Sequence, residues 1–86
     1  MNDAKKGRPC MKDHAELVRV KELVRKEIES LGIKDFTFHE LGANGLWVKA
    51  VMNADQRTML GEALGGKGIM MVPMGPFAFG VAVVDP

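Results

Sequence analysis

The residues of this chain that could act as acids, bases or nucleophiles are few and widely spaced. His39 and Glu40 are adjacent, His14 lies near the start of the chain, and Cys10 is the only cysteine. Adjacent residues of a strand point to opposite faces, so His39 and Glu40 cannot form a catalytic pair in an extended segment. Cys10 falls in a segment that we expect to be mobile, whereas a catalytic thiol needs an oriented base and a fixed environment. We therefore expect no catalytic residues and a protein that is not an enzyme.

Metal and cofactor sites are not indicated by the sequence either. Its two histidines and one cysteine lack the close pairing that a structural zinc site requires. The GGKG segment at 65–68 has the letter pattern of the GxxG loop in KH-type RNA-binding domains, but an apolar run follows it instead of a helix. It also lacks the spacing and the hydroxyl residue of a phosphate-binding P-loop. We expect no metal and no cofactor, and Lys67 is kept only as a candidate contact.

Trp47, the only tryptophan, is the residue best suited to hold a planar ligand. It alternates with Lys49 and lies across a predicted hairpin from either His39 or Thr37. On a half-polar strand face its indole ring offers a stacking surface for a base or a ligand ring. The alternative places Trp47 in the core, in the same layer as Phe36, and the sequence does not decide between the two. The candidate contacts for a ligand or a nucleic acid are Trp47, Lys49, His39 and Lys67.

The segment from Phe77 to Val84 is apolar on both of its alternating faces. In an extended chain the large residues from Phe77 to Val83 share one face, which has the volume to form a core. The other face is a strip of small residues, joined by at least one of the adjacent Met70 and Met71. Such an apolar strip usually marks an interaction surface. The candidate interface residues are Ala78, Gly80, Ala82, Met70 and Met71.

The period of the apolar side chains predicts the elements that would position these residues. From Asp13 to Gly32 apolar residues recur at steps of three and four, which predicts a helix. Asp13 and Glu16 have the spacing of a capping box, and Gly32 can take the left-handed conformation at the end. A second, shorter helix is predicted to begin after Asn53. Its expected apolar side comprises Met59, Leu60, Ala63 and Leu64.

Segments of period two predict four strands in two hairpins. The first hairpin runs from Lys34 to Met52 around an Asn44-Gly45 turn, and the second ends at Val84 and turns around the PMGP segment. The order α-β-β-α-β-β predicts a two-layer α+β sandwich, in which two helices cover one face of a four-stranded, mainly antiparallel sheet. The strip of small residues would then lie on the uncovered face.

With 86 residues, this chain is long enough for one small domain. We expect residues 1–11 to be a flexible arm, because Gly7 and Pro9 interrupt a segment without an apolar period, and residues 12–86 to form the domain. Beyond residue 10, nine basic and ten acidic residues give a formal charge of −1, which lacks the basic excess typical of non-specific nucleic-acid binders. We expect no signal peptide and no membrane span, and a single cysteine fits a cytoplasmic protein.

These features favour a non-enzymatic interaction module that self-associates as a homodimer through the apolar sheet face. Closed two-fold association is the commonest way for identical chains to cover such a patch. Two alternatives stay open: a nucleic-acid-binding accessory protein that uses the basic arm and Trp47, and a protein that binds a small apolar ligand in a methionine-lined cavity. Salt-sensitive binding that depends on residues 1–10 would distinguish the first alternative. No membrane partner is expected.

Overall fold

The described residues of the computed structural model, 7–8 and 10–84, form two helices and one antiparallel sheet. The helices are α1 (His14–Ser30) and α2 (Ala54–Gly65). The strands are β1 (Gly7–Arg8), β2 (Phe36–Leu41), β3 (Gly45–Ala50), β4 (Ile69–Gly75) and β5 (Ala78–Val84). After the short β1, the element order is α-β-β-α-β-β, as predicted. Neither helix in this part of the chain is long and apolar enough to cross a membrane.

Capping interactions define both ends of α1. The Asp13 carboxylate accepts a hydrogen bond of 2.8 Å from the backbone N–H of Glu16, which satisfies one of the free donors of the first turn. At the other end Gly32 has a φ of +80°, and the N–H of Ile33 donates to the carbonyl of Ile28. This bond is typical of a Schellman motif. The predicted start and end of the helix are therefore confirmed.

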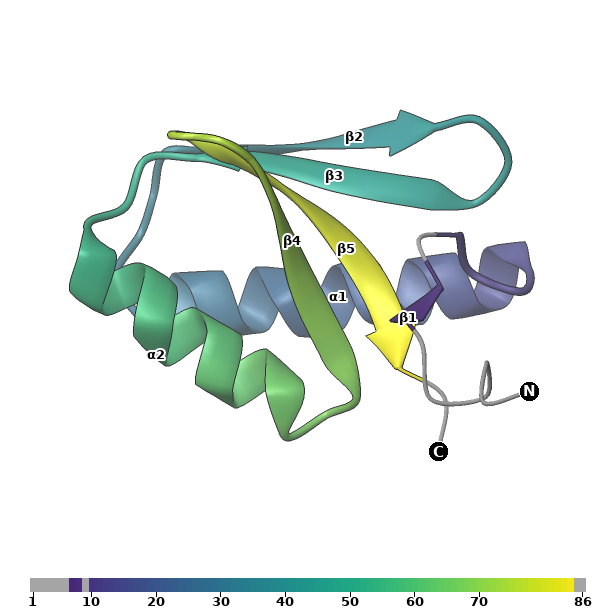
Figure 1. Cartoon of the computed structure of the whole chain (residues 1–86), viewed down its shortest axis with the longest axis horizontal. Coiled ribbons are helices and arrows are strands. Elements are labelled where there is room, and N and C mark those ends of the chain that lie inside the picture. The colour runs from purple at the N-terminus through teal and green to yellow at the C-terminus, as the bar shows by residue number, and fades with distance from the viewer. Residues whose placement is uncertain (1–6, 9, 85–86) are drawn as a thin grey trace.

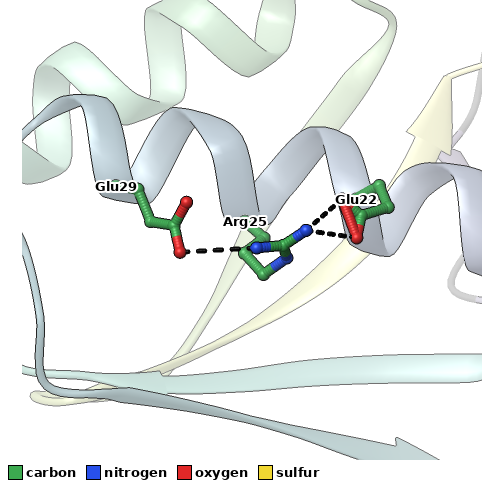
Figure 2. Close-up of polar contacts among 3 residues, drawn as sticks. All are labelled: Glu22, Arg25 and Glu29. Carbon is green, nitrogen blue, oxygen red and sulfur yellow. Dashed lines mark hydrogen bonds and ion pairs between the residues drawn. The ribbon is translucent and has the colours of Figure 1, made fainter.

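The solvent side of α1 carries a short chain of ion pairs. Figure 2 shows Arg25 between Glu22 and Glu29, donating hydrogen bonds to both carboxylates. The hydrogen bond from Arg25 lowers the pKa of Glu22 from its ordinary value, and the same bond raises the pKa of Arg25. Because the pKa of Glu22 is lower in the folded state, the ion pair with Arg25 stabilises the fold at neutral pH. This stabilisation is lost as the pH falls through the pKa of Glu22.

The sheet is built around β5. This strand pairs with β4 on one side and, from Ala78 to Gly80, with β3 on the other, while β2 pairs only with β3. Beyond Gly80, β3 and β5 diverge, and β1 takes the place of β3 beside β5. Figure 1 shows the two hairpins meeting near one end and separating toward the other, with both helices on the same side of the sheet. The divergence leaves a gap in the sheet that the N-terminal segment borders.

One apolar core lies between the helices and the sheet. Its buried members from the helices are Leu17, Val20, Val24 and Ile28 of α1 with Leu60 and Leu64 of α2. Its buried members from β3, β4 and β5 are Leu46, Val48, Ala50, Ile69, Phe79 and Val81. Val48 and Phe79 are register partners, so the covered face continues across the junction of the two hairpins. The predicted α+β sandwich with both helices on one face is confirmed.

The side of α2 that faces the sheet differs from the prediction. Leu60 and Leu64 are buried as expected, but Met59 is 54% exposed. The helix approaches β4 through Gly61, where an added Cβ would lie 3.8 Å from the sulfur of Met71. Because glycine has no side chain to bury, the apolar pattern alone could not show that this side faces the sheet.

The N-terminal segment is not a free arm where the structure describes it. β1 pairs with the end of β5, and Cys10 forms a β-bridge with Gly45. Met11 is 3% exposed, and its N–H donates to the carbonyl of Asn44 at 2.7 Å. The expected boundary after residue 11 is therefore wrong for these residues, because backbone pairing of a two-residue strand leaves no apolar period. Residues 1–6 and 9 of the expected arm lie outside the described part of the chain.

Deletion of residues 1–10 is expected to lower the melting temperature. The shortened chain keeps Met11 but loses the pairing of β1 and the bridge of Cys10 to Gly45. With each backbone hydrogen bond contributing about 0.5–1.5 kcal/mol, we expect a loss of roughly 1–3 kcal/mol. Thermal denaturation followed by circular dichroism measures it. An unchanged transition would contradict a stabilising role for this pairing.

Candidate functional site

The face of the sheet opposite the helices is uncovered by any described element, and we call it the open face. Register places its residues: Trp47 lies across from Gly80, and Met70 lies across from Ala82. The open face comprises Thr37, His39 and Leu41 of β2, Gly45, Trp47 and Lys49 of β3, Met70, Val72 and Met74 of β4, and Ala78, Gly80, Ala82 and Val84 of β5.

Large apolar side chains are exposed on the open face. Five of them are between 37% and 50% exposed: Leu41, Met70, Val72, Met74 and Val84. Lys49 is the one charged residue among the residues of this face. Contiguous apolar surface with so little charge is typical of an interaction site.

Four of the five candidate interface residues lie on this face. They are Ala78, Gly80, Ala82 and Met70. Met71 instead pairs with Val81 and packs against the core. It does not belong to the candidate interface, because adjacent residues of a strand point to opposite faces and Met70 takes the open side.

The small residues of β5 are buried or partly buried and are not an open strip. Ala82 is 2% exposed, and a Cβ added to Gly80 would lie 3.2 Å from the sulfur of Met74. The accessible surface is therefore supplied mainly by side chains that the sequence analysis did not select, Val72 and Met74 among them. The period of two that leads from Met70 to Val72 was the signal that could have found the first of these.

Trp47 lies on the open face and not in the core. It pairs with His39, and the two rings stack with centroids 4.3 Å apart and an angle of 18° between their planes. The Thr37 hydroxyl lies 3.1 Å from Nε2 of His39, within hydrogen-bond distance. The alternative that put Trp47 in the layer of Phe36 is wrong, since Phe36 pairs with Ala50 on the covered face. The stack uses one face of each ring.

The two candidate lysines do not lie at one site. Lys49 is on the open face, beside Ala78 in the register. Lys67 is paired with α1 instead, its ammonium 3.4 Å from the carboxylate of Glu27. Binding of a nucleic-acid backbone usually requires several cations along one surface. The described residues of the open face therefore supply little attraction for phosphates.

A hollow of about 190 Å³ lies in the open face where β3 and β5 diverge. It is lined by Cys10, Leu41, Gly45, Leu46, Val72, Met74, Gly80 and Val81, so its surface is almost entirely apolar. Two of these residues are glycines, which leave room that a side chain would take. A dry apolar cavity of about 150 Å³ can hold benzene. The hollow therefore has the size and chemistry to accept one aromatic ring.

Phe77 lies at the other end of the open face, although the sequence predicted it beside Phe79 in the core. It is 52% exposed and borders a second hollow, of about 320 Å³, together with Thr37 and Lys49. Phe77 precedes β5 and forms the turn with Pro76, so the alternation of the strand does not extend to it. The open face thus has an apolar hollow at one end and an exposed aromatic ring at the other.

In the part of the chain that the structure describes, the residues with acid, base or nucleophilic groups do not come together at one site. His39 lies on the open face, whereas Glu40 pairs with Leu46 on the covered face, as the strand period predicted. Cys10 is exposed beside the hollow. Within residues 7–8 and 10–84, no cluster of three or more His, Cys, Asp or Glu residues could hold a metal ion.

The geometry of the open face is the evidence on function that this chain offers. No protein-family model, curated protein or solved structure matches this chain.

Proposed function

We propose that this chain is a non-enzymatic interaction module that forms a homodimer through the open face. The observation that supports this function is the exposure of five large apolar side chains beside a single charge, on a face that no described element covers. Burying such side chains against an identical face removes apolar surface from water without desolvating many charges. A two-fold axis lets the same patch serve both copies.

The size of the face fits a small interface. Four strands about 4.8 Å apart, each contributing about six residues of about 3.3 Å, give a flat area of about 400 Å². Side chains raise the accessible area above this projection, toward the roughly 600–800 Å² per copy that small and standard interfaces bury. A domain of this size also gains stability by association, because alone it buries only about 60% of its unfolded surface.

A glutamate at Val72 tests the proposal. Val72 is 40% exposed on β4, so a carboxylate there is solvated in the monomer and is buried without a partner in the dimer. Light scattering at concentrations up to about 1 mM should give the wild type twice the 9.4 kDa mass of one chain. The Val72→Glu variant should have the mass of one chain. Circular dichroism should be unchanged. Ala82 is unsuitable for this test, because it is already buried and a charge there would unfold the chain.

Met59→Glu is the matched control, since Met59 is 54% exposed on α2, away from the open face. This variant should keep the dimer mass. A wild type that stays monomeric over the whole range, or a Val72→Glu variant that remains dimeric, would overturn the proposal. A monomer that retains an apolar compound through purification would also overturn it, in favour of ligand binding.

A further inference from the structure

An empty apolar hollow at an interface forfeits contacts, so two copies associate more strongly if a side chain fills the hollow of the open face. In a two-fold interface each patch meets itself, so a side chain that fills the hollow of one copy comes from the same patch of the other copy. We propose that the ring of Phe77 from a second copy occupies this hollow and that the reciprocal contact forms in the same dimer. This inference rests on the proposed function and adds the residues that meet.

Size and chemistry favour Phe77 as the occupant. The hollow of about 190 Å³ is apolar and matches a benzene-sized group. Phe77 is 52% exposed, more than any of the five large apolar side chains named for the open face. The other three phenylalanines are buried or partly buried, and Trp47 already stacks on His39. An exposed aromatic ring is also the kind of residue that dominates binding energy at interfaces.

Phe77 does not fill the hollow of its own chain: it lines the second hollow, and the far edge of the first hollow lies well beyond it. Cys10, at the edge of the hollow, is the bridge partner of Gly45, and the carbonyl of Phe77 accepts a hydrogen bond of 2.8 Å from the N–H of Ala50. Gly45 and Ala50 are the two ends of β3, which places them about 16 Å apart at about 3.3 Å per residue. A two-fold axis that crosses the strands near Trp47 exchanges the two ends and brings each ring over the partner's hollow.

The natural cysteine allows a direct test of this contact. Wild-type chain, which carries only Cys10, is mixed with a Cys10→Ser, Phe77→Cys variant, so that each chain has one thiol. A mixed dimer then places the two thiols together at one contact and keeps the Phe77 ring at the other. Oxidised glutathione joins the thiols as a disulfide and is itself reduced to two glutathione molecules. Mass spectrometry under non-reducing conditions should find mainly this mixed covalent dimer.

A Cys10→Ser, Val18→Cys variant is the control, because Val18 is 48% exposed on α1 and far from the open face. Its mixed product should form at the slow rate of random collision. Independently, Phe77→Ala should raise the dissociation constant of the dimer roughly 30-fold, as expected for a hot-spot residue. A dimer that gives no preferential cross-link to position 77 would contradict the placement of Phe77 in the partner's hollow, but it would not contradict self-association. A monomeric wild type would overturn both proposals.

Discussion

Replacement of Val24 by aspartate is expected to unfold the domain. Val24 lies in the middle of α1 and is completely buried against the other apolar residues of the core. No described residue of this core is polar or charged, so the carboxylate would have no partner. Burying an unpaired charge costs more than about 4 kcal/mol, against a total stability of roughly 5–15 kcal/mol for a typical domain. Circular dichroism should show no cooperative thermal transition.

Val18→Asp makes the same chemical change on the same helix and serves as the control. Val18 is 48% exposed, so its carboxylate stays in water and the cost should be within about 1 kcal/mol. The two variants lose the same β-branched side chain, so helix propensity does not separate them. Comparable large losses at both positions would mean that α1 is covered on a second side.

The contrast between these two valines could be predicted from the sequence because it depends on local information. Apolar residues recur along α1 at steps of three and four, and the four buried residues of the helix follow these steps. The helix starts are equally local. At α2 the side chain of Asn53 accepts from the N–H of Gln56, and the Gln56 side chain accepts from the N–H of Asn53, as the capping-box spacing predicted. Such signals need only neighbours along the chain.

Features that depend on distant segments could not be predicted in this way. β1 joins β5 through backbone hydrogen bonds between residues near the two ends of the chain, and such bonds require no particular side chain. The approach of Gly61 to Met71 is likewise a contact between elements that no period records. These tertiary contacts determine which residues of the N-terminal segment and of α2 are buried.

The candidate site also has features that depend on local sequence and features that depend on distant segments. The strand period correctly placed Gly80 and Ala78 on the face away from the helices. The hollow, in contrast, exists because β3 and β5 separate beyond Gly80, which depends on how the two hairpins meet. The exposed ring of Phe77 depends on where the second turn ends. The use of this face for self-association stays a prediction.

The second large effect is expected at Gly45, where alanine should destabilise the first hairpin by about 3 kcal/mol. An added Cβ would lie 2.4 Å from the carbonyl oxygen of Leu41, the register partner of Gly45. No side-chain rotation relieves this overlap, because the oxygen belongs to the backbone, so the strands must shift. Urea denaturation of the wild type and of Gly45→Ala, each at a fixed chain concentration, measures the difference.

The turn geometry shows why this glycine was misread from the sequence. An Asn-Gly pair usually signals positive φ at both residues, but the positive φ values here belong to Gly42 and Asn44. Gly45 is instead the first residue of β3, and it is required by the closeness of Leu41. The requirement is therefore steric and not conformational.

Gly65→Ala is the control, because neither space nor backbone conformation requires a glycine at position 65. Gly65 is the last residue of α2, its φ is not positive, and an added Cβ would meet nothing within 4 Å. Alanine there should leave stability unchanged or raise it by up to about 1 kcal/mol, because it favours the helix. A Gly45→Ala variant as stable as Gly65→Ala would show that the hairpin accommodates the methyl group. In that case the narrow approach of β3 to Leu41, and the shape of the hollow that Gly45 lines, would both need revision.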